Sequence, residues 1–227
     1  MNDKDTERFH AYMKECAAEA ARVARAVAAA GPDRLGDPTP CADYDLRALV
    51  NHWVLYTSHG LEHRALREPL PEELTRRDFT AGTAWAEEYA AQLDRAVAAW
   101  ADPAVWEGDV DFGGGSAPAV DVASMVVKEM AVHGWDAARG IGAEIVLSPE
   151  AGEFVLGVVE EHGEIYREYG GFADPVAVPA DASAFERALG ASGRDPRWSA
   201  GRRAGPGGQQ GPEGQRGRGV SGRGRGG

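Results

Sequence analysis

The 227-residue chain carries a formal net charge of −12, and 43% of its residues are hydrophobic. This apolar content is enough for a substantial core, whereas the negative charge argues against nucleic acid or an anionic membrane as a partner of the folded part. The two cysteines, Cys16 and Cys41, exclude a disulfide framework and a cysteine-rich zinc site. No apolar leader and no membrane-length apolar run are visible, so we expect a soluble, cytoplasmic protein.

Helical patterns follow one another along the chain, with loops rich in glycine and proline between them. Asp45 and Asp121 are expected to cap two of the helices, and the pair Ser148–Pro149 is expected to open another. The stretch 102–120 contains three consecutive glycines and is compatible with a short hairpin. The expected helices span residues 6–30, 45–67, 82–101, 121–142, 148–169 and 182–189. This order predicts an all-α protein.

The composition changes abruptly after residue 200. Residues 201–227 hold 12 of the 30 glycines, six arginines and one glutamate, which leaves the rest of the chain with a net charge of −17. Such a segment cannot bury enough apolar surface to offset its chain entropy. We therefore predict a folded domain at 6–200 and a disordered Gly/Arg-rich tail at 201–227. Arg-Gly tails can bind RNA, but a passive extension is the favoured interpretation here.

The expected helix at 121–142 places two ionisable groups on its apolar face. Glu129 and His133 are one turn apart, at the spacing of the buried stripe. The other members of this stripe are Val122, Val126, Met130 and Ala137. A buried carboxylate without a partner costs several kcal/mol, so Glu129 requires compensation.

A histidine from the expected helix at 45–67 points toward the same interior. A divalent metal held by His52, Glu129 and His133 would satisfy all three groups, and two histidines with one glutamate form a catalytic zinc set with an open fourth position. The alternative is a simple hydrogen bond between Glu129 and His133. A pair between Glu129 and Lys128 is disfavoured, because adjacent helical residues point to different faces.

The other histidines and one cysteine receive less specific predictions. His59 and His63 are expected at the surface or rim of the bundle, and His10 and His162 are expected to be exposed on their helices. Cys41 precedes the helix that carries His52, and a buried structural thiol is favoured over a residue that lines the site.

Three segments of the sequence resemble one family. Residues 33–54, DRLGDPTPCADYDLRALVNHWV, and residues 128–142, KEMAVHGWDAARGIG, resemble the mycothiol-dependent maleylpyruvate isomerase-like metal-binding proteins of the DinB-like superfamily. The ending at 172–198 resembles a subgroup of that family. The resemblance covers nearly all of residues 6–200.

The resemblance implies a DinB-like four-helix bundle of up-down-down-up order, followed here by an extra C-terminal helical segment. It places the metal triad of the family on His52, Glu129 and His133, the three residues that the helical spacing selects. The metal is expected to be Zn2+, although imidazole and carboxylate ligands also suit Ni2+, Fe2+ and Mn2+. The isomerase carries a further C-terminal α/β domain, whereas the region after Gly142 is shorter here and mostly helical.

The same resemblance implies thiol chemistry, with the low-molecular-weight thiol mycothiol as cosubstrate. A metal-coordinated thiol ionises, and its thiolate would attack an electrophilic small molecule to give S-transfer or, when the addition reverses after bond rotation, isomerisation. Asp136 is expected either to orient a ligand imidazole or to be a polar residue at the helix end. A metal-dependent hydrolase with His59 or Asp136 as general base and a non-catalytic binding module are the alternatives, and a homodimer is compatible with each.

Overall fold

The structure is a computed structural model, which describes residues 3–200; the tail predicted at 201–227 lies outside the described residues. Its helices are α1 Asp3–Ala30, α2 Leu46–Val54, α3 Gly60–Leu66, α4 Glu72–Thr75, α5 Trp85–Ala99, α6 Ala119–Ile141, α7 Pro149–Glu168 and α8 Ala184–Ala191. The predicted hairpin is present, because β1 Asp109–Asp111 pairs antiparallel with β2 Ser116–Pro118 just before α6. Within this range, no helix combines the length and the apolar character needed to cross a membrane.

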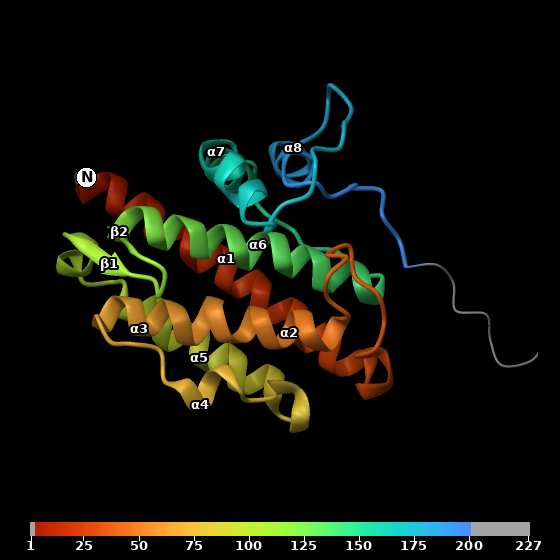
Figure 1. The fold of residues 1–227 in the computed structure, drawn as a ribbon, viewed down its shortest axis with the longest axis horizontal. Helices are drawn as coiled ribbons and strands as arrows, with labels where there is room; N and C mark the ends of the chain where they lie inside the picture. Colours follow the sequence, from red (N-terminus) through yellow and green to blue (C-terminus); the bar gives the residue numbers. More distant parts are fainter. Residues whose placement is uncertain (1–2, 201–227) are drawn as a thin grey trace, which may run out of the picture.

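Four long rods form a bundle, with α2 and α3 making one continuous rod (Figure 1). α1 and α6 run in one direction, and α2–α3 and α5 run in the other, which confirms the up-down-down-up order (Figure 1). α1 packs against α5 and α6, and the α2–α3 rod packs against the same two helices. α7 and α8 pack together and lie on the side of α6 that faces away from α2 (Figure 1).

Two of the three predicted helix-start signals are confirmed, at α2 and α7, and the third, at α6, is wrong. The Asp45 side chain accepts a hydrogen bond from the Ala48 N–H at the start of α2, and Ser148 caps α7 with a proline at its first position. The predicted cap at Asp121 is wrong, since α6 already begins at Ala119. Pro118 ends β2 with a φ suited to the start of a helix, so Asp121 falls within the first turn.

The rod predicted as one helix at 45–67 contains a π-helical turn at Leu55–His59. Two buried hydroxyls bond to backbone carbonyls of the preceding turn: Thr57 Oγ1 donates to the Trp53 oxygen at 2.6 Å, and Ser58 Oγ donates to the Val54 oxygen at 2.7 Å. Such bonds compete with the helical ladder, and they accompany the wider turn here. The turn changes which face of the rod the residues after His59 occupy.

A glycine brings the rod close to α6. Trp53 is fully buried and its indole N–H donates to the Met130 carbonyl at 3.3 Å. A Cβ added at Gly134 would lie 3.2 Å from the Trp53 ring, so the glycine leaves room for the indole. This approach places His52, the residue before Trp53, beside Glu129 and His133 of α6.

Candidate metal centre

Glu129 and His133 meet on the face of α6 that looks toward α2. The Nε2 atom of His133 lies 2.8 Å from Oε2 of Glu129, as expected for residues one helical turn apart. The side chain of His133 is 10% exposed and that of Glu129 is 20% exposed, so neither is fully solvated. The sequence prediction that these two groups share a sheltered face is therefore correct in its geometry.

His52 completes the group from α2. Its Nε2 atom is 3.8 Å from Oε2 of Glu129, and its ring centroid is 5.1 Å from that of His133. Tyr44 and Tyr56 flank the imidazole, with ring centroids at 5.4 Å and 4.8 Å. The two tyrosines therefore restrict the ring to an orientation that faces α6.

The three donor atoms suit a small divalent ion. One ligand atom each from His52, Glu129 and His133 can be chosen so that all lie within 4.8 Å of one another. Donors of a tetrahedral zinc ion, at metal distances near 2.1 Å, are roughly 3.4 Å apart. The observed Nε2–Oε2 separations of 2.8 Å and 3.8 Å bracket that value, so small side-chain movements bring the set to coordination distance.

Lys128 compensates Glu129, against the prediction from the sequence. Its ammonium group pairs with Oε1 of Glu129 although the residues are adjacent, and Lys128 is fully buried. The four-carbon stem lets the charge reach around the helix, and the ammonium lies 3.8 Å from the centroid of the Tyr166 ring of α7. Burial alone would raise the pKa of Glu129, but Lys128 and His133 hold it well below its usual range.

Asp136 holds the other side of the His133 ring. Its Oδ2 atom lies 3.0 Å from Nδ1 of His133, which leaves Nε2 directed at Glu129 and His52. Asp136 is fully buried and also accepts hydrogen bonds from the Arg194 guanidinium, at 3.0 Å from Nη2. Burial would raise the pKa of Asp136, but Arg194 and His133 lower it, so the carboxylate remains charged.

Arg194 comes from the C-terminal segment, by which we mean residues 143–198. Its side chain is 6% exposed, and it reaches Asp136 across 58 positions of sequence. Sequence reasoning missed this contact, because an arginine beyond the last expected helix has no periodic relation to α6. Of the two interpretations of Asp136, the contact with the His133 imidazole favours the one in which it orients a candidate ligand.

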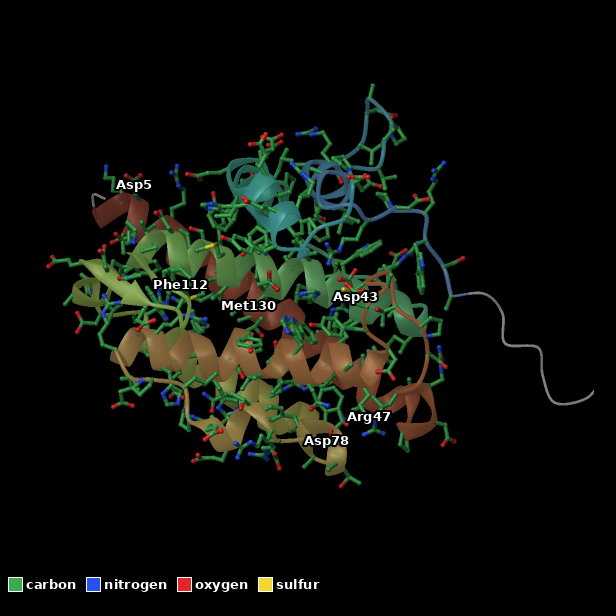
Figure 2. All side chains as sticks on the ribbon, in the orientation of Figure 1. Asp5, Asp43, Arg47, Asp78, Phe112 and Met130 are labelled. Carbon is green, nitrogen blue, oxygen red and sulfur yellow. The ribbon has the colours of Figure 1, made fainter. Side chains whose placement is uncertain are left out.

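A cavity of about 640 Å3 opens beside the three candidate ligands. Its walls come from α2, α3, α6, the hairpin, α7 and the loops that flank them. Asp43 and Phe112, which both line it, lie near opposite ends of the space between α6 and the α2–α3 rod (Figure 2). The lining includes the aromatic residues Tyr44, Tyr56, Phe112, Tyr166 and Tyr169. The candidate ligands are thus reachable from a space of the size that holds small molecules.

His59 is not brought to this cavity. It lines a different pocket with Phe79, on whose ring it stacks at a centroid distance of 5.3 Å. Its half-buried position agrees with a place at the rim of the bundle, but not with a base that acts beside His52. Burial, followed by the nearby Arg77, lowers the pKa of His59.

Three other sequence predictions need correction or refinement. His10 is not exposed, since its ring nitrogen lies 2.9 Å from the Val97 carbonyl in a half-buried position. His162 is 21% exposed and lines the metal-site cavity, so the prediction of an exposed residue is also wrong. Cys41 lines the same cavity and is only partly buried, so the favoured prediction of a buried structural thiol is wrong and the alternative, a residue that lines the site, is the one observed.

Cys41 also belongs to a second possible ligand group, with His133 and Asp136. In the described residues, however, both carboxylate oxygens of Asp136 already face Arg194, and one of them also contacts His133. Burial, with a contribution from Asp136, raises the pKa of the Cys41 thiol to about 11. The group formed by His52, Glu129 and His133 is therefore the better candidate.

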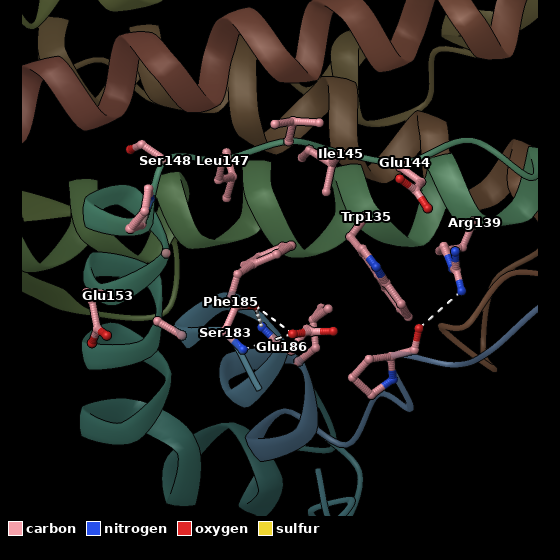
Figure 3. Close-up of a pocket in the computed structure, with 16 residues that line it drawn as sticks. Trp135, Arg139, Glu144, Ile145, Leu147, Ser148, Glu153, Ser183, Phe185 and Glu186 are labelled. Carbon is pink, nitrogen blue, oxygen red and sulfur yellow. Dashed lines mark hydrogen bonds between the residues drawn. The ribbon is translucent and has the colours of Figure 1, made fainter. Parts of the chain in front are cut away.

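A second cavity, of about 460 Å3, lies on the opposite side of α6. Figure 3 shows Trp135 and Arg139 of α6 facing Phe185 and Glu186 of α8. Arg139 donates to the carbonyls of Pro196 and Trp198, each at 3.1 Å. These bonds hold the end of the C-terminal segment against α6, one helical turn after Asp136, with which Arg194 pairs.

One family model matches the chain. It is described as the mycothiol maleylpyruvate isomerase N-terminal domain, and the match covers residues 16–138, more than half of the sequence. The matched range includes His52, Glu129, His133 and Asp136 but ends before the C-terminal segment. No curated protein and no solved structure matches the chain.

Proposed function

The chain belongs to the mycothiol maleylpyruvate isomerase N-terminal domain family, and we propose that it is a metal-dependent enzyme that joins a low-molecular-weight thiol to an electrophilic small molecule. The supporting observation is the group of His52, Glu129 and His133 at the wall of a 640 Å3 cavity. That volume falls within the range of small-molecule sites and has room for more than a bound ion. The family makes mycothiol the first candidate for the thiol.

His52, Glu129 and His133 would hold the metal, for which Zn2+ is the best match to two imidazoles and a carboxylate. When bound, the ion supplies a site at which a thiol loses its proton and becomes a nucleophilic thiolate. Asp136 accepts a hydrogen bond from Nδ1–H of His133 and thereby keeps Nε2 free as a donor atom. Lys128 balances the charge of Glu129 from the buried side.

The cavity walls bind and orient the two small molecules. Tyr44 and Tyr56 flank His52, and Phe112 and Tyr169 add apolar surface farther along the cavity. Such walls exclude water around the ligand, and the resulting low dielectric strengthens polar contacts within the site. Attack of the thiolate would form a carbon–sulfur bond and expel a leaving group, or reverse after rotation in an isomerisation.

A hydrolase is less well supported by the same geometry. It needs a general base near the metal, and the two sequence candidates were His59 and Asp136. His59 lines another pocket, and Asp136 is buried with both oxygens facing Arg194. In the described residues, neither side chain is placed to take a proton from a water beside Glu129.

A direct test uses the full chain, first measured for metal content by elemental analysis. Protein loaded with Zn2+ is mixed with mycothiol and chlorodinitrobenzene, whose ring carbon exchanges chloride for the thiol sulfur to give an absorbing thioether. We expect thiol-dependent product formation that falls more than about a hundredfold in His52→Ala. His59→Ala is the matched control, since it removes an imidazole from the same rod without altering the cavity.

Two results would contradict the proposal. Protein purified without chelator that holds no stoichiometric metal, and takes none up, would remove its basis. Metal-loaded protein that binds mycothiol without accelerating its reaction with any of a panel of electrophiles would instead indicate a non-catalytic binding module.

A further inference from the structure

Arg64 brings a positive charge without a partner to the cavity beside the metal ligands. Among residues 3–200, its side chain makes no hydrogen bond and no ion pair, and its Nε and Nη1 atoms are buried without a partner. Arg64 lines the cavity, and its third guanidinium nitrogen, Nη2, is not among the buried atoms without a partner, so it is the atom that a ligand in the cavity can contact. Because a partly buried guanidinium without a hydrogen-bond or ion-pair partner is costly, such an arginine is suited to an anionic ligand.

The π-helical turn at Leu55–His59 directs Arg64 to this cavity. Arg64 follows His52 by 12 positions, which in an unbroken α-helix would place it about 120° around the axis. The additional residue of the π turn removes about 100° of that rotation, so Arg64 returns to the face of His52. The irregularity of the rod therefore aligns the arginine with the metal ligands.

Gly60 provides the space for the guanidinium. A Cβ added at Gly60 would lie 2.7 Å from Nη1 of Arg64, so any side chain at this position would displace the group. Gly60 itself is helical, with a φ of −59°, and no backbone conformation requires glycine there. The contact with Arg64 gives a physical reason for a residue that otherwise weakens a helix.

The negative charges around the cavity do not neutralise Arg64. Glu129 acts on it through space but is already paired with Lys128 and His133. Asp43 and Asp121 also line the cavity, and neither forms an ion pair with Arg64. These carboxylates would repel a ligand of high negative charge, whereas a single carboxylate matches one guanidinium.

We propose that Arg64 binds the carboxylate of a small, singly charged organic substrate whose apolar part lies against the aromatic walls of the cavity. Phe112, Ile165 and Tyr169 line the same cavity and are 43%, 52% and 81% exposed, so apolar surface is available to such a ligand. The proposal names the substrate class of the site and rests on the proposed function in taking this cavity as the place of reaction.

Calorimetric titration of the full chain with benzoate tests the proposal, with benzyl alcohol as the neutral probe of similar shape. Both titrations are run on zinc-loaded and on chelator-treated protein, so that binding at Arg64 is separated from binding at the metal. We expect saturable benzoate binding in both forms and at least about tenfold weaker affinity in Arg64→Met. Arg76→Met is the control, because Arg76 is exposed and pairs with Glu72 on the surface.

Gly60→Ala provides a second variant that does not touch the arginine itself. Alanine favours the helix, so the fold is retained, while the added methyl group displaces the guanidinium and weakens benzoate binding. No saturable benzoate binding by the wild type, equal affinity in Arg64→Met, or equal affinity for benzyl alcohol would overturn the proposal. Protein that binds benzoate through Arg64 but takes up no zinc would instead contradict the proposed function and leave the anion site standing.

Discussion

The helical bundle and the C-terminal segment contribute to the same site in different ways. The bundle carries the candidate donor atoms, since His52 comes from α2 and both Glu129 and His133 come from α6. The C-terminal segment supplies none of these three residues, but it contacts their neighbours. Arg194 forms an ion pair with Asp136, which contacts His133, and the Tyr166 ring covers the ammonium group of Lys128, which pairs with Glu129. In the proposed metal centre, the bundle would provide the ligands, and the C-terminal segment would help to fix their geometry and charge.

The family match covers residues 16–138, whereas two contacts to the residues around the candidate ligands come from the C-terminal segment. Lys128 and Asp136 are buried charged residues of the bundle, where they contact Glu129 and His133. Each also has a partner from beyond residue 142, since Tyr166 covers Lys128 and Arg194 pairs with Asp136. Without those contacts the two charges would lack part of their compensation. The C-terminal segment is therefore expected to affect metal binding even though it contributes no ligand to the triad.

The largest effect is expected when a ligand from the bundle is removed. In His52→Ala we expect metal affinity to fall more than about a hundredfold, because one of three protein ligands is lost. The free energy of unfolding of the metal-free protein should change by less than about 1 kcal/mol, since the side chain is partly exposed and its removal leaves no buried charge. Competition with a chromophoric chelator and urea unfolding measure the two quantities. Unchanged affinity in this variant would remove His52 from the ligand set.

Removal of Arg194 tests the contribution of the C-terminal segment. Arg194→Met leaves Asp136 buried and charged without its main partner, so we expect a loss of about 3 kcal/mol in unfolding free energy. Metal affinity should fall by roughly ten- to a hundredfold, because Asp136 no longer holds His133 in a fixed orientation. Arg197→Met is the control, as Arg197 is exposed and pairs with its exposed neighbour Asp195.

Asp136→Asn in the Arg194→Met background separates the two effects. The double variant should recover part of the stability, since the uncompensated charge is gone, without recovering the full metal affinity. Equal metal affinity in wild type and Arg194→Met would contradict the expectation that the C-terminal segment supports metal binding.

We expect the pH dependence of metal binding to depend on His133, which contacts Asp136, the residue that Arg194 pairs with. Burial alone would lower the pKa of His133, but Glu129 and Asp136 raise it above its ordinary value of 6.5. Metal binding must displace the proton from this imidazole, so affinity is full above the raised pKa and falls about tenfold per pH unit below it. The decline should therefore begin above pH 6.5 as the pH is lowered. Chelator competition at a series of pH values checks this, and a decline that begins only in the titration range of a carboxylate would contradict it.

The sequence predicts the helices and the pairing of Glu129 with His133 because both follow the 3.6-residue period. It also selects His52, but the approach of α2 to α6 depends on how Trp53 fits against Gly134, which no spacing rule gives. The π turn at Leu55–His59 could not be predicted, since the hydroxyl bonds of Thr57 and Ser58 arise only in the folded rod.

The remaining misses concern long side chains and contacts distant in sequence. Lys128 was set aside because neighbouring residues face apart, yet its stem is long enough to bring the ammonium back to Glu129. Arg194 reaches Asp136 from a segment without helical periodicity, so pattern reasoning offers no link between them. Helical faces were thus predictable, whereas the groups that balance their buried charges required the tertiary structure.

The smallest effect is expected at Cys41, which distinguishes the two possible ligand groups that share His133. Asp136 is occupied by Arg194, and the raised pKa of about 11 keeps the Cys41 thiol protonated near neutral pH in the absence of a metal. Cys41→Ala should therefore change zinc affinity by less than about threefold, a shift well under 1 kcal/mol. The same chelator competition measures it, and Cys41 in metal-free protein should react slowly with iodoacetamide. A large loss of affinity in Cys41→Ala with no loss in His52→Ala would move the metal to Cys41, His133 and Asp136. The C-terminal segment, through Arg194, would then compete with the ion for Asp136 instead of supporting its site.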